Sequence, residues 1–409
     1  MARCTQPPIP LPPPLRGAEV GTFTHYSVAT RLPDIARRVL AENDLPPASV
    51  AHIEALIADI PTAPIRPLDE PLAPDAADWA CYIAPYLGQD WLAVPWFFAE
   101  MYFYRRLLEA IGAFRPGPGQ GLDPFAYQKR QGLETTREAI RALSTRLGAG
   151  EWRPATFSSL LHVALWGNQA DLSLWPAGRN EPPSHADLAA QQRHILVDET
   201  ADIARRLWGD AHGPIPALRV DFLVDNAGFE LVCDLALADA LLTGGSAATV
   251  TLHVKAHPTF VSDATADDVH HTVIFLADDA ARPVQALAER LHGHLEAGRL
   301  RLRPDPFWTS PLAAWEMPAA LHNALAQAHL VISKGDAHYR RLLGDRHWPY
   351  TTPFADVVCY FPAPIAALRT CKSEVMLGLQ SGQAEALARD DPAWETNGRW
   401  GMIQFAGLE

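Results

Sequence analysis

Apolar residues in the first half of the chain follow the period of an α-helix. From residue 33 to about residue 208 they recur at intervals of three and four positions, which places them on one face of a helix. Pro95 precedes the longest such stretch, and proline suits the first turn of a helix. The pattern predicts helices over residues 34–40, 49–57, 96–111, 133–148, 156–166 and 185–208. We therefore expect a helical domain over residues 21–212.

The pattern changes after residue 213, where short apolar runs alternate with helical stretches. The runs predict strands over residues 217–225, 249–254, 273–276, 329–333, 357–360 and 402–405. Helical spacing lies between several of them, over residues 231–242, 284–297, 317–327, 336–343 and 383–388. This alternation is typical of a parallel sheet with helices on both faces. We expect an α/β fold, a three-layer αβα Rossmann-like sheet domain, over residues 213–409.

Composition bears on the N-terminal segment and on the cellular location of the protein. Six prolines among residues 1–17 exclude the apolar core of a signal peptide and predict a disordered tail over residues 1–20. No apolar run approaches the roughly 18 residues that span a bilayer, so no membrane partner is expected. Five scattered cysteines without a CxxC pair suit reduced thiols. We expect a cytoplasmic protein.

Charge excludes one class of partner. The chain has 34 basic and 47 acidic residues, a net charge of −13, and no run of Lys or Arg longer than a pair. A nucleic-acid-binding protein needs a basic surface, so nucleic acid is not expected as a partner. An anionic substrate must then be held locally, by a cation or by a few placed basic side chains. The sequence leaves the oligomeric state open.

Acidic residues follow several of the predicted strands. Asp225 and Asn226 end the first strand, Asp263 follows the second, and Asp336 follows the strand at 329–333. In an open parallel sheet ligands bind beyond the carboxyl ends of the strands. Carboxylate and amide oxygens suit Mg²⁺ or Mn²⁺, so a divalent-cation site is one interpretation. The same residue types form turns and cap helices, and this second interpretation stays open.

Two further patterns have a functional and an ordinary interpretation. Arg369 and Lys372, in the sequence Arg-Thr-Cys-Lys, could hold a phosphate, or they could form an exposed basic turn. The histidines near the second strand could suggest a metal, but the spacing of His253, His257, His270 and His271 fits no standard zinc signature.

Taken together, the motifs resemble those of the damage-control phosphatase family (domain of unknown function 89), and specifically its subfamily with an RTxK motif. They occur in the order of the family from about residue 21 to the end of the chain. The segments that carry the resemblance are residues 21–23, 31–33, 100–106, 165–173, 225–231, 260–263, 334–346, 362–364, 369–372 and 401–405.

The resemblance implies a metal-dependent phosphatase acting on small sugar phosphates such as fructose 1-phosphate or fructose 6-phosphate. It implies Mn²⁺, Co²⁺, Ni²⁺ or Mg²⁺ as cofactor, with Asp225, Asn226 and Asp263 as ligands. These three and Asp336 are the expected catalytic residues. The expected substrate contacts are Arg31, Asp225, Asn226, Asp336, Tyr339, Arg340, Arg369 and Lys372. Asp336 could act on the attacking water, serve as nucleophile or bind sugar hydroxyls, and Asn168 and Asp171 could support the site or cap a helix.

The chain departs from the family pattern at Thr259, Ala337 and His338, which puts the substrate preference in question. Two alternatives follow. One is an S-adenosylmethionine-dependent protein-glutamate O-methyltransferase, an activity with which the family has been credited. The pair Gly244 and Gly245 follows a helix and not a strand, unlike the glycine-rich turn of such enzymes. The other is a pathway-specific relative that binds a phosphorylated metabolite without fast hydrolysis.

Overall fold

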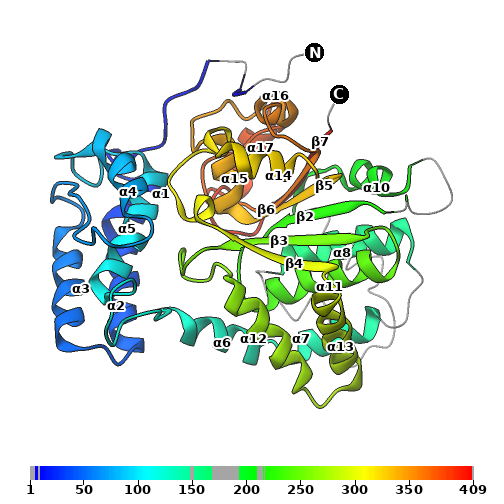
Figure 1. Ribbon diagram of the computed structural model, residues 1–409. Coiled ribbons are helices and arrows are strands. Elements are labelled where there is room, and N and C mark those ends of the chain that lie inside the picture. The colour runs from blue at the N-terminus through cyan, green and yellow to red at the C-terminus, as the bar shows by residue number, and fades with distance from the viewer. Residues whose placement is uncertain are drawn as a thin grey trace.

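A seven-stranded sheet forms the centre of the molecule in the computed structural model, which describes residues 5–7, 10–147, 152–167, 193–209, 215 and 217–407 (Figure 1). The strand order is β1-β7-β6-β5-β2-β3-β4. The five strands from β6 to β4 are parallel to one another, whereas β7 runs antiparallel to β6 and pairs in parallel with β1. The strands are β1 (Ile195–Asp198), β2 (Arg219–Leu223), β3 (Thr249–Lys255), β4 (Leu300–Asp305), β5 (Leu330–Lys334), β6 (Ile365–Thr370) and β7 (Gly401–Ala406).

Helices cover both faces of this sheet, which confirms the predicted three-layer α/β fold. Alternate residues of a strand enter different cores: Leu330 and Ile332 of β5 join one, and Val331 joins the other. The first core also holds residues of α7 (Arg137–Leu147), α8 (Pro154–Trp166), α10 (Thr200–Trp208), α11 (Phe229–Thr243), α12 (Ala266–Ala277) and α13 (Arg282–Glu296). The second holds residues of α14 (Ala319–Leu325), α15 (Gly335–Leu343) and α16 (Phe354–Val358), and α17 (Gln383–Asp390) contributes to a third, smaller cluster.

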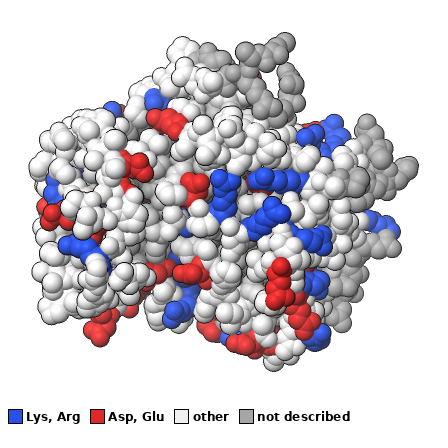
Figure 2. Space-filling view, in the orientation of Figure 1, with Lys and Arg blue, Asp and Glu red and all other residues white. Residues whose placement is uncertain are grey.

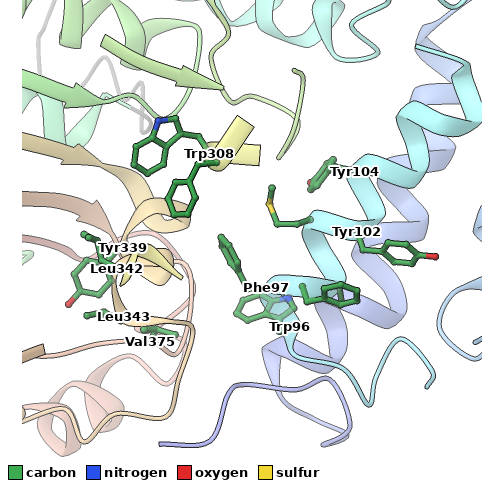
Figure 3. Close-up of a cluster of buried hydrophobic side chains, with 14 of the residues drawn as sticks. Trp96, Phe97, Tyr102, Tyr104, Trp308, Tyr339, Leu342, Leu343 and Val375 are labelled. Carbon is green, nitrogen blue, oxygen red and sulfur yellow. The ribbon is translucent and has the colours of Figure 1, made fainter. Parts of the chain in front are cut away.

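The N-terminal helices pack around α5, all of whose residues are buried. They are α1 (Phe23–Tyr26), a π-helical turn (Ser27–Arg31), α2 (Leu32–Glu42), α3 (Pro47–Asp59), α4 (Ala76–Ile83) and α5 (Trp96–Ile111) itself. The next helix, α6 (Ala126–Glu134), contributes Leu133 to the first core. The second core continues from α5 into the α/β part. Figure 3 shows Trp96 and Phe97 of α5 on the side that faces Leu342 and Leu343 of α15. Buried apolar area therefore fixes α5 beside α15.

Three expectations about boundaries are wrong. The sheet begins before residue 213, because β1 lies at residues 195–198 and α8 packs against β6 and β7. A continuous helix over 185–208 is excluded by β1, although α10 occupies its end. The N-terminal segment is also not disordered throughout: Leu15 is buried, its N–H donates to the Asp345 carbonyl (2.9 Å) and its carbonyl accepts from Trp96 (2.8 Å).

Two predicted strands are helices. Residues 273–276 lie in α12, where Val269, Val273 and Leu276 are buried at helical intervals and Ile274 is 59% exposed. Residues 357 and 358 lie in α16. A short apolar run has no period long enough to separate strand from helix, which explains both errors. The strands β4 and β6 were not predicted, because alternating arginines and alanines obscure their apolar pattern.

The remaining features of the fold are the distribution of surface charge and the state of the cysteines. Figure 2 shows basic and acidic side chains interspersed on the face of Figure 1. None of the described helices is long and apolar enough to cross a membrane. Cys81, Cys233 and Cys371 have free thiols, as expected, whereas Cys359 is disulfide-bonded, which the expectation of reduced thiols did not include.

Candidate functional site

A cavity of ≈ 320 Å³ lies at the point where the order of the strands reverses. The chain runs from β2 to β3 and β4 on one side, then returns to β5 and β6 on the other, so the carboxyl ends of β2 and β5 diverge there. The wall includes residues that follow β2, β5 and β6. Arg31, Trp96 and Glu100 of the helical region complete it. The fold therefore places a cavity where the sequence predicts the site, at the carboxyl ends of the strands.

Asp225 and Asn226 occupy the turn between β2 and α11. Gly228 ends the turn with φ +77°, a conformation that favours glycine, and α11 starts at the next residue. Gly335, at the end of β5, lies against this turn with φ +81°. A Cβ atom at position 335 would approach Asp225 Oδ2 to 1.8 Å. Glycine at this position therefore gives the Asp225 carboxylate its space.

Asp263 reaches the same place through a loop that is bound to the Asp225 turn. Asn226 and Asp263 form an isolated antiparallel bridge, and the Ala264 N–H donates to the Asp225 carbonyl (2.7 Å). Phe260 and Val261 turn the loop with positive φ values of 46° and 69°. Backbone hydrogen bonds, and not only side-chain contacts, thus bring Asp225, Asn226 and Asp263 together. We call these three residues the cation cluster.

The cation cluster concentrates negative charge away from water. Burial raises the pKa of Asp225 well above its usual value, and the Asp263 and Glu230 carboxylates raise this pKa further. Burial also raises the pKa of Asp263, against the opposing effect of Lys255, whose Nζ lies 2.8 Å from Asp263 Oδ2. Two neighbouring buried carboxylates are costly as anions unless a cation shares them. This arrangement favours the binding of a positive ion.

The donor atoms suit a hard divalent cation. Asn226 Nδ2 donates to Asp225 Oδ2 (2.7 Å) and to Glu230 Oε2 (2.9 Å), and Asn226 Oδ1 accepts from Ser262. Within the described residues no group of three or more His, Cys, Asp or Glu side chains forms a metal site. The set offered here is two carboxylates and one amide, all oxygen donors, which Mg²⁺ and Mn²⁺ accept. The residues present therefore fit the implied cofactor.

Lys372 supplies a positive charge to the wall of the cavity. The chain has four lysines. Three of them, Lys129, Lys255 and Lys334, are buried in ion pairs with carboxylates. Lys372 lines the cavity, is only partly buried, and makes no ion pair or side-chain hydrogen bond with any described residue. An uncommitted ammonium beside a cation site is well suited to a phosphate group.

Asp336 lines the cavity. Arg369 and Tyr339, which are also predicted to contact the substrate, lie beneath Asp336. Arg369 Nη2 is 2.8 Å from Asp336 Oδ1, which also accepts from Ser373 Oγ (2.9 Å). The Arg369 guanidinium stacks on the Tyr339 ring at 4.5 Å. Arg369 and Tyr339 are each 1% exposed and neither lines the cavity, so their contact with substrate stays a prediction without support from the cavity wall. Burial makes them supports of Asp336.

Arg340 and Arg31 meet at a buried glutamate between the helical and the α/β parts. Arg340 lies 2.6 Å from Glu100 and 2.7 Å from Asp345, and its guanidinium stacks on Trp96 at 3.5 Å. We call Arg340, Glu100 and Asp345 the interface cluster. Arg31 contacts the other Glu100 oxygen at 3.1 Å and remains 37% exposed. Both arginines line the cavity, and their contact with substrate stays a prediction; all three guanidinium nitrogens of Arg340 already meet carboxylates.

Comparison with known proteins gives the family. The family model described as the damage-control phosphatase ARMT1-like domain matches residues 27–387. This chain belongs to that family. It is 36% identical to the damage-control phosphatase ARMT1 of Danio rerio over 336 residues, which cover 78% of this chain and 74% of the relative. It is 30% identical to the ARMT1 of Homo sapiens over 441 residues, covering 97% and 99% of the two chains.

A solved structure is also similar. A DUF89 family protein from Pyrococcus horikoshii, determined at 2.04 Å, shares 13% sequence identity, with a TM-score of 0.48 over 93% of this chain and 97% of that one. The family model and the relatives named damage-control phosphatase ARMT1 confirm the family resemblance expected from the motifs, and with it the enzyme class, a phosphatase.

Sequence reasoning missed several residues of this candidate site. Glu230 touches Asn226 and Lys334, and Lys255 touches Asp263. A signal existed, because Lys255 and Lys334 each end a strand that holds no other Lys, Arg, Asp or Glu, in a chain with four lysines. Glu100 lies in a quoted motif but was given no role.

The departures from the family pattern lie in different places. Ala337 lines the cavity, whereas Thr259 and His338 are buried outside its wall. Of these three residues, only Ala337 is placed to change the substrate preference by direct contact with the substrate. Asn168 and Asp171, the expected supporting residues, lie outside the described part of the chain.

Proposed function

We propose that this chain is a divalent-cation-dependent phosphatase of small sugar phosphates, with fructose 1-phosphate and fructose 6-phosphate as the first candidates. One observation carries the proposal: the cation cluster and the uncommitted Lys372 share one cavity of ≈ 320 Å³. This volume lies at the lower end of the range for small-molecule sites, which is about 300–1,000 Å³. Membership of the damage-control phosphatase family supports the reaction type, and the motif resemblance supports the sugar phosphates.

Each of these residues would have a separate role in phosphoryl transfer. Asp225, Asn226 and Asp263 would hold the cation, which when bound polarises a phosphoryl oxygen and offsets charge in a loose transition state. Lys372 would bind the phosphoryl oxygens as a point charge. The free N–H groups in the first turn of α11, after Gly228, would add to the stabilisation of this charge.

Asp336 would accept a hydrogen bond from the attacking water. Arg369 and Ser373 hold its carboxylate at the cavity wall, which fixes the direction of this acceptor. Arg31, from the helical region, would close the cavity over the sugar, since its side chain is partly exposed and anchored to Glu100.

The test is the release of inorganic phosphate from a panel of sugar phosphates, with Mn²⁺, Co²⁺, Ni²⁺, Mg²⁺ or a chelator. We expect turnover with a divalent cation and none with the chelator. Asp225→Ala and Asp263→Ala should each lower turnover at least about 10³-fold, because several kcal/mol of charge stabilisation are lost at about 1.36 kcal/mol per factor of ten.

The matched control is Asp202→Ala, which changes an exposed aspartate on α10 that pairs only with a neighbouring arginine. It should keep full turnover. Circular dichroism and thermal unfolding of all three variants would show that the fold is intact. Full activity in both cation-cluster variants would refute the assignment of the cation ligands.

A further inference from the structure

Lys255 is held by three contacts at the end of β3. Its Nζ lies 2.8 Å from Asp263 Oδ2, 2.9 Å from His338 Nε2 and 3.3 Å from the Val224 carbonyl oxygen. The residue is 2% exposed. Two N–H donors of the ammonium group are hydrogen-bonded, to His338 and to Val224, and its charge is paired with Asp263 Oδ2, which accepts no hydrogen bond from the described residues. These contacts hold the ammonium group beside Asp263.

His338 completes this arrangement as an acceptor. Nε2 of His338 lies 2.9 Å from Lys255 Nζ and 3.1 Å from the Val224 carbonyl oxygen, and it accepts from the lysine in the tautomer that carries its proton on Nδ1. Burial lowers the pKa of His338 well below its usual value, and the Lys255 charge lowers it further, which keeps the imidazole neutral. The Trp308 ring packs against the imidazole with the centroids 5.2 Å apart. His338 thus fixes Lys255, and Lys255 fixes one oxygen of Asp263.

The two carboxylates of the cation cluster are limited in the same way. Oδ2 of Asp263 is taken by Lys255, which leaves Oδ1 for the cavity that this residue lines. Oδ2 of Asp225 accepts from Asn226 and lies against the Gly335 backbone, which again leaves Oδ1. Glu230 has both oxygens engaged, one by Asn226 and one by Lys334. Each cluster carboxylate therefore offers one oxygen to a cation.

We propose that Lys255 is a specificity-determining residue that restricts Asp263 to one-oxygen coordination and so favours Mg²⁺ or Mn²⁺ over Ca²⁺. The inference rests on the proposed cation site. Ca²⁺ takes six to eight oxygens and often binds a carboxylate through both of its oxygens, whereas Mg²⁺ takes six, one or two of them from carboxylates, and keeps places for water and substrate phosphate. A site with few single oxygens fits the second behaviour.

The experiment measures binding of Mn²⁺ and Ca²⁺ to the full chain by titration calorimetry, without substrate. We expect the wild-type chain to bind Mn²⁺ more tightly than Ca²⁺. Lys255→Met frees the second Asp263 oxygen, so the Ca²⁺ affinity should rise relative to the Mn²⁺ affinity by about tenfold, which corresponds to about 1.4 kcal/mol. A role of Lys255 in stability alone would not change this ratio.

Lys129→Met is the matched control. Lys129 is 5% exposed and paired with Asp123 and Asp268; it acts on Asp263 only through its charge, without contact. Loss of this charge should raise both affinities together and leave their ratio unchanged. A ratio that changes equally in both variants would show a charge effect and overturn the proposal.

A second variant covers the case in which Lys255→Met does not fold. His338→Phe keeps the lysine and removes one of its three contacts, so the ratio should rise by a smaller factor. If the variants that fold keep the wild-type ratio of Ca²⁺ to Mn²⁺ affinity, the proposed role of Lys255 is overturned. The cation site itself is not affected by that result. A wild-type chain that binds neither ion overturns both this inference and the proposed metal dependence.

Discussion

The cation cluster and the interface cluster are both buried groups of charged side chains, yet they are completed in opposite ways. In the interface cluster, Arg340 meets Glu100 and Asp345 within 2.6–2.7 Å, and the Asp345 carboxylate also accepts from the Phe97 N–H (3.0 Å). In the cation cluster, Asp225 has an amide as its hydrogen-bonding neighbour and two further carboxylates nearby. With Arg31 counted, the two carboxylates of the interface cluster contact two guanidinium groups, whereas the two carboxylates of the cation cluster have one ammonium group in contact, that of Lys255.

The difference shows how the same chemistry serves stability and function. A paired buried charge is satisfied and holds two elements in register, here α5 and α15. A buried charge that is incompletely paired raises the free energy of the site when no ligand is bound. Binding of a cation and a phosphate would lower that free energy again. Three expected changes would break or sharpen this comparison.

Glu100→Gln should have the largest effect, and it should be on stability. Glu100 is fully buried and serves Arg340 and Arg31 at once. Removing one partner of a buried ion pair costs about 3–5 kcal/mol, because the remaining charge is left buried. Urea unfolding of the purified protein would measure the loss.

The control for this change is Glu289→Gln. Its pair with Arg282 has the same N–O distance of 2.6 Å as the pair of Glu100 with Arg340, but both side chains are more than 60% exposed. Exposed pairs contribute little to stability. Equal losses in the two variants would contradict the view that burial sets the cost.

Lys372→Met should have the opposite effect to Glu100→Gln: it should lower the activity and leave the stability unchanged. Lys372 has no ion-pair partner among the described residues, so its removal breaks no contact within the protein. Removal of one preorganised donor typically costs about 10²–10³ in turnover, or about 2.7–4 kcal/mol. Phosphate-release kinetics and thermal unfolding would be compared on the same samples. Lys372→Arg, which keeps the charge, should recover part of the rate, and a stability loss in Lys372→Met would contradict the assignment.

The smallest expected effect is a dependence of stability on pH. The pKa of Asp225 is raised in the folded state above its usual 3.8. The folded chain therefore binds a proton more readily than the unfolded chain, and stability in a chelator should increase as the pH falls through the raised pKa toward 3.8. Thermal unfolding at a series of pH values would measure this trend.

Asp225→Asn is the control for the pH series, since an amide does not titrate. It should flatten the trend. Saturating Mn²⁺ should reverse the trend in the wild-type chain, because a bound cation favours the ionised carboxylate. A slope that is the same in wild type and Asp225→Asn would assign the dependence to other groups.

The sequence predicts where the candidate site lies better than it predicts which side chains contact one another there. Asp225, Asn226, Asp263 and Lys372 follow strands or quoted motifs, and the convergence of parallel strands at one edge brings them together. The roles of Arg369 and Tyr339 could not be predicted, because only the packing of β6 against α15 shows that both are buried beneath Asp336.

The same limit applies to the secondary structure. The long periodic stretch of α5 is predicted to its bounds, since sixteen residues contain several turns of a repeating pattern. The four-residue run at 273–276 belongs to a helix whose period its neighbours define. The segment of β6, Ile-Ala-Ala-Leu-Arg-Thr, has weak strand preference, and its burial between β5 and β7 makes it a strand.

The position of β7 has a consequence for the order in which the sheet is assembled. β1 pairs with β7 alone, and Ile195 lies opposite Gly401, 206 positions further along the chain. A growing polypeptide that has not yet produced β7 leaves both β1 and β6 with an open hydrogen-bonding edge, and such edges invite aggregation. Because so distant a pairing closes slowly, we expect this half of the sheet to form last, after the cavity-bearing strands have already associated.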